Sequence, residues 1–392
     1  MRHFGVTARG VRMPVIHAGD PLEDIIFDTV TAALDEEHIS VCDGDIIGIT
    51  ESIVARAQKN YASIQDIAQD VRRKCGQGPV GLIFPILSRN RFLAILQGIA
   101  SGVDELIIQL SYPSDEVGNA LVSLDQIDEK GVNPFTDSFD DATFRKLFGP
   151  DLLHPFTHCD YPRMYQEVGK HIKIIYSNQA KDILKYTKKV IAADIHTRHR
   201  TKRLLKQAGA EIMLGLDDIL NHAVDGSGYN PDYGLLGSNF ASEGKLKLFP
   251  RDSQSLVDSL QKRFFDRYQK HIEVLVYGDG AFKDPYGKIW ELADPVVSPF
   301  FTKGLEGTPH ELKFKLLADT KFAHLQGQEA KQKMADEIMA NKQKALKEQS
   351  LGTTPRHLTD LIGSLCDLTS GSGDKGTPVI YIQGYFDTYA DE

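Results

Sequence analysis

The sequence has few cysteines, and they lie far apart. The 392 residues include four, with no C-x-x-C pair among them: Cys42, Cys75, Cys159 and Cys366. Disulfide scaffolds and structural zinc sites need thiols at closer spacing, so both classes are excluded. Long apolar runs are missing as well. The longest, residues 80–87, is broken by Pro85, and it is shorter than the roughly 18–20 residues of a membrane-spanning helix.

Basic residues are outnumbered in this chain. There are 45 Lys and Arg against 54 Asp and Glu, which gives a formal net charge of −9. A general nucleic-acid binder or a protein of anionic membranes needs a basic surface, so we expect neither partner. A negative net charge is still compatible with a local basic pocket that holds a phosphorylated ligand. No apolar segment follows the arginines at the N-terminus, so we expect no secretory signal and a cytoplasmic protein.

Length and composition indicate a folded protein. Hydrophobic residues make up 41% and charged residues 25% of the chain, which is ordinary globular usage and excludes a disordered or fibrous protein. At roughly 100–200 residues per domain, the length corresponds to two domains or to one domain with a large insertion.

Hydrophobic patterning predicts helices and strands toward both ends of the chain. Apolar residues at helical spacing after Pro21 predict a helix, and residues 46–49 predict a buried strand. The same criteria predict helices at 64–74, 253–268 and 359–368, and strands at 245–249, 271–277 and 378–382. The charged stretch 321–349 has few large apolar side chains, which is typical of a solvated helix.

The central stretch, residues 80–230, shows a different pattern of predicted helices and strands. Strands are predicted at 105–110, 171–176, 189–193 and 211–214, alternating with helices at 91–102, 179–188 and 197–207. Residues 111–165 show only weak periodicity. Strands that alternate with helices favour a βαβ-type subdomain with a parallel sheet.

A glycine-rich loop is the strongest local signal for ligand binding. Residues 370–377 read S-G-S-G-D-K-G-T and precede a predicted strand. Glycines let backbone N–H groups approach a phosphate closely, and Lys375 adds charge. Asp374 offers a ligand for a metal or a sugar hydroxyl. No G-K-[ST] leads into a helix, so the loop is not a Walker A motif. The same residues are also compatible with a plain turn.

Carboxylates gather after the strand at 271–277. Asp279, Asp284 and Glu291 fall within one loop, and carboxylate oxygens are the ligands that Mg²⁺ and Mn²⁺ prefer. The alternative interpretation is a pair of tight turns with Trp290 as an apolar anchor.

Two polar segments offer further candidates. Residues 237–244, G-S-N-F-A-S-E-G, place Ser238 and Asn239 where they contact a base or ribose, or cap a turn. The basic run at 196–203 suits a carboxylate- or phosphate-rich substrate, and His196 and His199 within it suit a shared metal. A solvated helix face is the alternative. No G-x-S-x-G elbow is present, so nucleophilic catalysis has no support.

The order of these motifs resembles the coenzyme F-420-0:L-glutamate ligase (gamma-glutamyl ligase) family. The blocks that carry the resemblance are R-M-P-V-I-H-A-G-D-P-L with D-G-D-I-I-G-I-T-E-S-I-V-A-R-A-Q, then G-S-N-F-A-S-E-G-K-L-K-L-F-P, then the strand ending at Asp279 with D-P-Y-G-K-I-W, and last G-S-G-D-K-G-T-P-V-I-Y-I-Q-G. They fall within residues 5–75, 232–292 and 355–386, and we identify no counterpart of residues 80–230.

The resemblance implies an α+β fold and a homodimer. Its mixed-sheet, gamma-glutamyl-ligase-like core would consist of residues 1–79 and 231–392, and residues 80–230 would form an inserted βαβ-type subdomain. The implied activity is a GTP-dependent amide ligase that activates the carboxylate of a small-molecule acid as an acyl phosphate. The amine of L-glutamate, or a similar amine, then attacks. GTP is the implied co-substrate and Mg²⁺ or Mn²⁺ the implied cofactor.

The resemblance also implies site residues. The catalytic residues would be Arg56 and Asp279, and the metal ligands Asp279 and Asp284. Ser238 falls in the segment that pairs a metal ligand with a nucleotide contact. The nucleotide would be bordered by Met13, Pro14, Val15, Ile16, Glu51, Ser52, Arg56, Asn239, Ser370, Gly371, Ser372, Gly373, Asp374, Lys375, Gly376 and Thr377.

Three positions depart from the family pattern. Arg56 replaces a lysine, Leu236 replaces a metal-binding aspartate, and Gly280 replaces a threonine. Asp225 and Asp232 are the nearby substitutes for the missing metal ligand. A non-catalytic protein that shares the ligase fold and binds a nucleotide or phospho-ligand is therefore the alternative function. The insertion either recruits a protein partner or holds an active site of its own.

Overall fold

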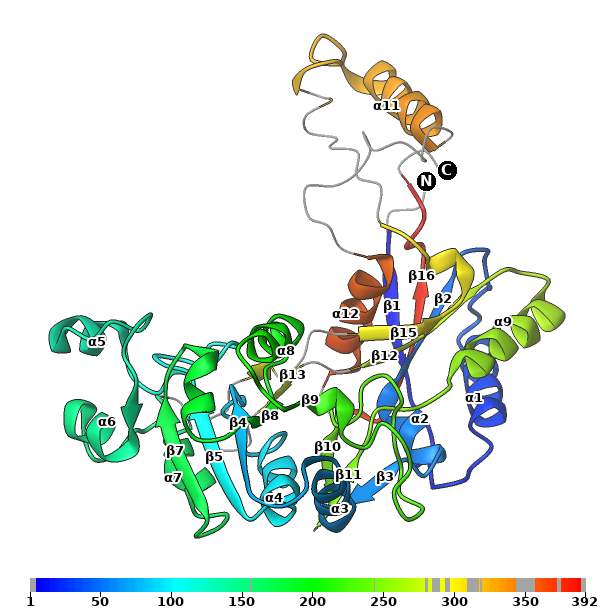
Figure 1. The fold of residues 1–392 in the computed structure, drawn as a ribbon. Coiled ribbons are helices and arrows are strands. Elements are labelled where there is room, and N and C mark those ends of the chain that lie inside the picture. Colours follow the sequence, from blue (N-terminus) through cyan, green and yellow to red (C-terminus); the bar gives the residue numbers. More distant parts are fainter. Residues whose placement is uncertain are drawn as a thin grey trace. The chain divides into compact units, whose positions relative to one another are not determined.

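The fold is described from a computed structural model of the chain (Figure 1). The described residues are 5–155, 157–242, 244–278, 281–283, 290–292, 297–308, 317, 319–342, 357–371 and 375–388. The chain divides into two compact units. Unit 1 consists of Met1–Val54, Asp252–Gly278 and Val296–Glu392, and unit 2 consists of Ala55–Arg251 and Asp279–Pro295. The predicted division at residues 79 and 231 concerns the limits of the ligase-like core and stays a prediction.

Unit 1 is built on a five-stranded mixed sheet. Its strands, in spatial order, are β1 (Thr7–Val11), β16 (Val379–Gln383), β2 (Ile46–Thr50), β12 (Glu273–Gly278) and β15 (Val297–Phe301). Only β2 and β12 pair in parallel, and the other neighbours are antiparallel. The mixed sheet agrees with the predicted α+β class. The sequence analysis did not predict β1. It is an edge strand in which Val11 is the only buried residue, so it has no apolar run to indicate a strand.

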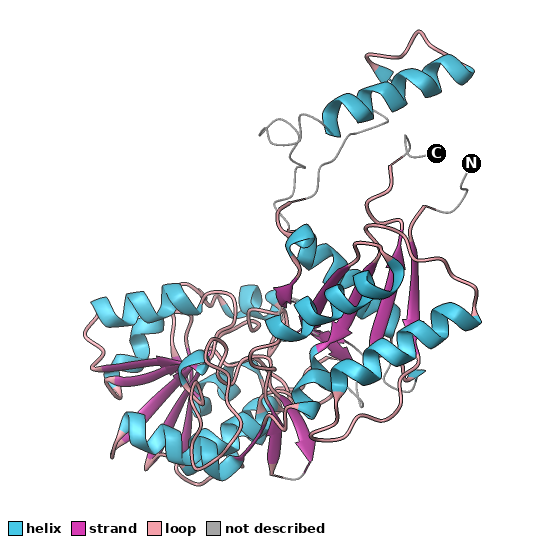
Figure 2. Ribbon diagram, turned by 90° about the vertical axis from the view of Figure 1, so that its right-hand side faces the viewer, coloured by secondary structure: helices cyan, strands magenta, loops and turns pink. Residues whose placement is uncertain are grey.

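Helices cover both sides of this sheet (Figures 1 and 2). On one side, α12 (Leu358–Ser370) places Ile362 and Cys366 in a buried cluster with β2, β12 and β16. On the other side, α1 (Leu22–Glu36) pairs with α9 (Gln254–Tyr268). The rings of Phe27 and Phe264 meet edge to face at 5.2 Å. Apolar burial on both faces therefore makes the sheet the core of unit 1.

A tight contact fixes α12 against the sheet, and it supports a stability prediction. A Cβ atom at Gly48 would lie 2.3 Å from the Sγ atom of Cys366. Gly48→Ala is therefore expected to lower the free energy of unfolding by about 1–3 kcal/mol, as urea denaturation would measure. Cys366→Ala removes that sulfur, so the double variant is expected to cost less than the two single costs added. Additive costs would contradict this contact.

Unit 2 contains a six-stranded sheet. Its strands, in spatial order, are β6 (Phe139–Asp140), β7 (Ile172–Tyr176), β5 (Glu105–Leu110), β4 (Pro79–Ile83), β8 (Lys189–Ala192) and β9 (Ile212–Gly215). All neighbours pair in parallel except β6 with β7, which confirms the parallel pairing predicted for this stretch. From β4 the chain adds β5 and β7 on one side and later β8 and β9 on the other.

Six α-helices lie within the described part of unit 2: α3 (Ile64–Cys75), α4 (Leu93–Ser101) and α8 (Arg198–Gln207) lie near predicted positions, whereas α5 (Leu124–Lys130), α6 (Asp141–Phe148) and α7 (Tyr161–Gln166) fall in residues 111–165, where no helix was predicted. The helix predicted at 179–188 is wrong, because only a short 3₁₀ helix, η1 (Ala180–Lys185), forms there. The chain must straighten to enter β8, and the Thr187 hydroxyl donates to the Pro79 carbonyl (2.7 Å) at that point.

Smaller elements complete the described structure. β3 (Tyr61–Ser63), β10 (Asn239–Ser242) and β11 (Lys245–Lys247) form an antiparallel sheet, and β13 (Ala281–Lys283) pairs with β14 (Trp290–Leu292). Two 3₁₀ helices, η2 (Leu216–Asp218) and η3 (Lys303–Leu305), follow strands β9 and β15. In the charged stretch, α11 (Gly327–Lys342) forms. Within the part of the chain that is described, no helix combines the length and apolarity needed to cross a membrane.

Candidate active site

Four strand ends meet at one edge of the five-stranded sheet. Val11 at the end of β1 lies opposite Val379 at the start of β16, and Val379 lies opposite Ile49 near the end of β2. Ile49 in turn pairs with Val276 near the end of β12. The segments that leave or enter the sheet here are residues 12–16, 51–52, 375–378 and the chain after Gly278. Three of these four segments contain predicted nucleotide contacts, and the fourth leads into Asp279.

Hydrogen bonds join these segments. The Met13 N–H donates to the Gly376 carbonyl (3.0 Å), and the Thr50 N–H donates to the Pro378 carbonyl (3.0 Å). The Thr377 hydroxyl donates to the Ser370 carbonyl (3.1 Å) at the end of α12. The Thr377 side chain also lies close to the backbone of Gly10, since a Cβ atom at Gly10 would lie 2.8 Å from the Cβ atom of Thr377. The predicted nucleotide segments at 13–16 and 370–377 are therefore neighbours.

The side chains of these segments differ in exposure. Ile16 is buried and anchors its loop, whereas Pro14 and Val15 are exposed and Met13 is half-buried. Lys375 is exposed, and its Nζ atom lies close over Gly371. Gly371 and Gly376 have positive φ angles of 61° and 65°, which only glycine adopts without strain. Ser372, Gly373 and Asp374 lie outside the described residues.

The short helix α2 (Glu51–Ala57) carries three further predicted contacts and leads from unit 1 into unit 2. Glu51 is buried directly after β2, while Ser52 and Arg56 are exposed. Residues four apart share a helix face, so Ser52 and Arg56 present a hydroxyl and a guanidinium side by side. A guanidinium binds phosphate oxygens in a bidentate manner.

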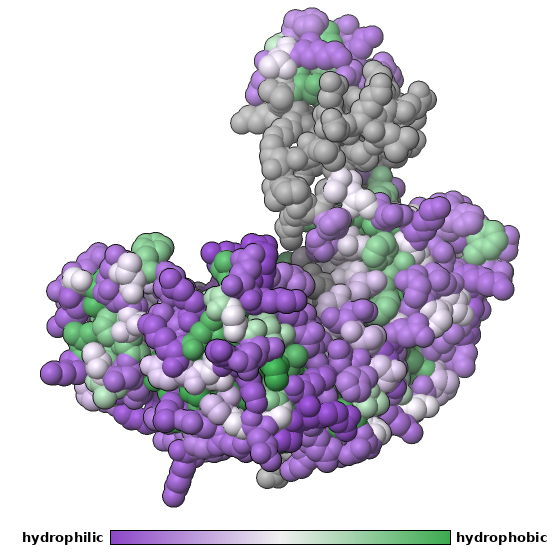
Figure 3. Space-filling model, viewed as in Figure 1, coloured by the Kyte–Doolittle hydropathy of each residue, from purple (hydrophilic) through white to green (hydrophobic). Residues whose placement is uncertain are grey.

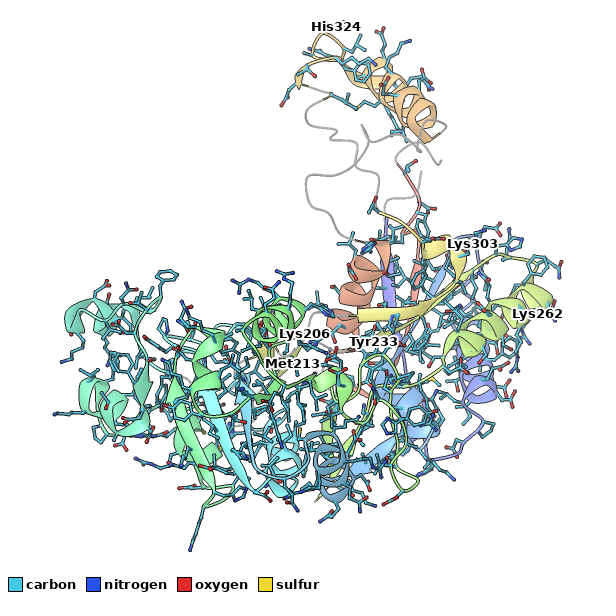
Figure 4. The ribbon with its side chains drawn as sticks, in the orientation of Figure 1. Lys206, Met213, Tyr233, Lys262, Lys303 and His324 are labelled. Carbon is cyan, nitrogen blue, oxygen red and sulfur yellow. The ribbon has the colours of Figure 1, made fainter. Side chains whose placement is uncertain are left out.

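Two buried asparagines that the sequence analysis missed hold the segment 228–250 in unit 2. Asn60 donates to the Phe249 carbonyl (2.7 Å) and accepts from the Tyr229 N–H (2.9 Å). Asn230 donates to the Pro250 carbonyl (3.0 Å) and accepts from the Tyr233 N–H (2.8 Å). Figure 4 labels Tyr233 within this segment. The only sequence signal was the turn-forming N-P-D at Asn230.

Asn230 supports a second prediction. Asn230→Ala would remove the acceptor of two N–H groups and the donor to two carbonyls in a buried region. We expect the free energy of unfolding to fall by about 1–3 kcal/mol, the usual cost of buried polar groups left unsatisfied. Urea unfolding followed by circular dichroism would measure this loss. Gln207→Ala, at the exposed end of α8, should leave the midpoint unchanged, and equal midpoints for both variants would contradict the prediction.

Ser238 has a structural role in this segment, and Asn239 lies in a strand. The buried Ser238 hydroxyl donates to the Leu235 carbonyl (2.7 Å), so it caps a turn, one of the two readings left open by the sequence. Asn239 starts β10 opposite Lys247. Leu236, at the position of the missing aspartate, is buried in the apolar core of unit 2.

The predicted metal ligands, Asp279 and Asp284, lie outside the described residues. Within the described ranges no group of three or more His, Cys, Asp and Glu side chains is placed to hold a metal ion. Asp225 and Asp232, the substitutes considered above, are both exposed.

Residues 198–203 of the basic run form the first turns of α8, and His196 and Thr197 precede the helix. Arg198 forms an ion pair with Asp217 (3.1 Å), and Lys202 contacts Asp218. His199, Arg200 and Arg203 are exposed, and the space-filling view shows hydrophilic residues over this helix (Figure 3). Most of the run therefore forms a solvated helix face.

Comparison with known proteins identifies the family of the chain. Residues 10–384 match the family model described as F420-0:gamma-glutamyl ligase. This match also runs across residues 80–230. A curated relative named coenzyme F420:L-glutamate ligase, from Methanothermobacter thermautotrophicus, is 36% identical over 93 residues, which are 22% of this chain and 35% of the relative. The matched region thus spans about a third of that relative's length. By the extent of the family match, the chain belongs to the F420-0:gamma-glutamyl ligase family.

Proposed function

We propose that the protein is a GTP-dependent amide ligase that requires Mg²⁺ or Mn²⁺ and joins L-glutamate, or a similar amine, to a small-molecule acid. The observation that carries the proposal is the meeting of residues 12–16, 51–52 and 375–378 at one sheet edge, where backbone hydrogen bonds join Met13 to Gly376 and Thr50 to Pro378. Glycines with positive φ and the exposed Lys375 suit phosphate groups at this edge.

The reaction follows from the chemistry of amide formation. A carboxylate is a poor electrophile, so one of its oxygens first attacks the γ-phosphoryl group of GTP and GDP leaves. The amine nitrogen then attacks the carbonyl carbon of the acyl phosphate, inorganic phosphate leaves and the amine loses a proton. In this proposal Arg56 and Lys375 bind phosphate oxygens. A divalent ion held by Asp279 and Asp284 would neutralise charge on the transferring phosphoryl group.

The first test is nucleotide binding. Isothermal titration calorimetry with GTP and with ATP, each with and without Mn²⁺, should show micromolar, metal-dependent binding that favours GTP. Absence of binding for both nucleotides under every metal condition would overturn the proposal. Asp279→Asn and Asp284→Asn should weaken the metal-dependent part, whereas Asp266→Asn, on the exposed side of α9, should not.

One observation favours a second candidate, a nucleotide-binding protein without ligase activity. Leu236 occupies the place of an aspartate in the family pattern and is buried in an apolar cluster, so it contributes no metal ligand. Phosphate release separates the two functions. A ligase releases phosphate from GTP only when both an acid and an amine are present, and a binding protein releases none under any condition.

A further inference from the structure

We propose that unit 2 associates with a second copy of the chain, and that the basic face of α8 in one copy docks on the acidic surface around Phe135 in the next. The acidic surface consists of residues 124–140, and the basic face of α8 consists of His199, Arg200, Arg203 and Lys206. The proposal goes beyond the ligase function and does not depend on it. Of the two roles considered for residues 80–230, it selects the recruitment of a protein partner.

Phe135 is an exposed aromatic residue on a loop that the rest of unit 2 holds in place. It is 79% exposed, yet hydrogen bonds fix the backbone around it. The Gln179 amide donates to the Phe135 carbonyl, and the Asn178 amide donates to the carbonyl of the preceding residue (3.1 Å). The Tyr112 hydroxyl donates to the Asp137 carbonyl (2.8 Å). An aromatic residue on a preorganised loop loses little conformational entropy on binding, and such residues contribute much of the energy of protein interfaces.

Negative charge predominates in the segment that holds Phe135. Residues 124–140 contain five acidic residues and one basic residue. Asp125, Asp128 and Glu129 are exposed, and none of them forms an ion pair with any residue that the structure describes. Leu124 at the start of α5 is 67% exposed, and Figure 3 shows hydrophobic residues at the surface around this helix. The acidic surface therefore suits a partner that is basic and that also covers apolar side chains.

The exposed side of α8 carries the opposite charge. Leu205 is buried in an apolar cluster of unit 2, so the basic face of α8 lies on the arc of the helix that points to solvent. Arg198 and Lys202 each contact an aspartate of η2, whereas the cations of the basic face form no ion pair with the described residues. Positive charge therefore stays available on α8, although the chain as a whole has a formal net charge of −9.

The two charged surfaces belong to opposite edges of the six-stranded sheet. The acidic surface ends in β6, α8 leads into β9, and β6 and β9 are the edge strands. Figure 1 shows α5 and β9 at opposite ends of this sheet. Surfaces so placed do not pair within one copy, but they meet when copies are arranged head to tail, in a heterologous contact that is able to repeat. A second copy is therefore a partner whose charges match on both sides of the contact, and matched charges speed encounter and set specificity.

Sedimentation velocity of the whole protein tests the proposal, at increasing protein concentration in about 0.05 M and about 0.5 M NaCl, because salt screens contacts between charged surfaces. We expect the mean mass to rise with concentration at low salt and to rise less at high salt. Phe135→Ala, and separately the double change Arg200→Glu with Arg203→Glu, should each raise the apparent Kd of association at least about tenfold. The matched controls are Leu153→Ala, an exposed apolar residue outside the acidic surface, and Arg73→Glu, an exposed cation on α3. Both should leave the Kd unchanged.

A mixture of the two weakened variants gives the most specific result. The Phe135→Ala variant keeps the basic face of α8, and the variant with glutamates at 200 and 203 keeps the acidic surface. A head-to-tail contact therefore predicts that the two variants associate with each other, although neither associates with itself. A contact between two identical surfaces predicts no such rescue.

The proposal is overturned by a mean mass that does not depend on concentration at low salt, by association that the folded variants leave unchanged, or by absence of association in the mixture. Circular dichroism and thermal melting establish that each variant is folded. Fluorescence anisotropy with labelled oligouridylate tests the other occupant that a basic helix suits. RNA binding that depends on Arg200 and Arg203, without self-association, would make nucleic acid the partner and would equally overturn the proposal.

Discussion

Lys375→Ala is expected to weaken GTP binding by about ten- to a hundredfold. A hydrogen bond to a charged group contributes about 1.5–3 kcal/mol, and each 1.4 kcal/mol is a factor of ten in Kd. Lys375 is exposed in the loop that precedes β16, beside the Met13 segment that bonds to Gly376. Its ammonium group is therefore available to phosphate oxygens at this sheet edge. Calorimetric titration of GTP in the presence of Mn²⁺ gives the Kd.

The matched controls are lysines of unit 1 outside the predicted segments. Lys262 on α9 and Lys303 at the start of η3 are both exposed and are labelled in Figure 4. Lys262→Ala and Lys303→Ala should leave the Kd unchanged. If all three variants bind GTP equally, the glycine-rich loop is a plain turn and the nucleotide lies elsewhere.

Asp45→Ala is expected to lower the free energy of unfolding by about 2–4 kcal/mol, since it leaves two buried donors, on Tyr381 and Gln383, without their acceptor. The Asp45 carboxylate is buried at the start of β2. It accepts hydrogen bonds from the Tyr381 hydroxyl (2.5 Å), the Cys42 N–H (2.8 Å) and the Gln383 amide (3.1 Å). These bonds tie β2 to β16. Urea denaturation would measure the loss, and a cost below 1 kcal/mol would show that the network contributes little.

The pH dependence of stability tests the same network through the Tyr381 hydroxyl. Burial and the hydrogen bond to Asp45 raise the pKa of Tyr381 above its usual value. A raised pKa means that the folded state holds the proton more tightly than the unfolded chain. The resulting stability is complete below about pH 10, the pKa of an unfolded tyrosine, and is lost as the pH rises through the folded pKa. Tyr381→Phe should therefore lose less stability than the unmodified protein between pH 10 and 12.

The sequence predicted the parts of the fold that depend on local pattern. Buried strands with continuous apolar runs, such as β2, β12 and β16, lie close to their predicted positions. β1 was missed because an edge strand buries little and so carries no apolar run. The order of the six-stranded sheet was beyond prediction, since pairing between β4 and β8 depends on residues more than a hundred positions apart.

The residues of the candidate site also differ in how clearly the sequence indicated them. Glycines and Lys375 carried a signal because a phosphate loop needs those residue types in sequence. Asn60 and Asn230 carried almost none, since their role is to bond to backbone groups of residues that folding brings near.

Unit 1 is made of three separate stretches of the chain, and this affects how it folds while the ribosome is making it. β2 lies between β16 and β12 in the finished sheet, yet β12 begins at Glu273 and β16 at Val379. At roughly 5–20 residues per second, a ribosome that has made β2 needs roughly 10–45 s to reach β12. During that interval β2 has neither neighbour, and unpaired apolar strands of this kind aggregate. The chain order therefore makes the apolar strand β2 wait, unpaired, until after most of unit 2 has been made.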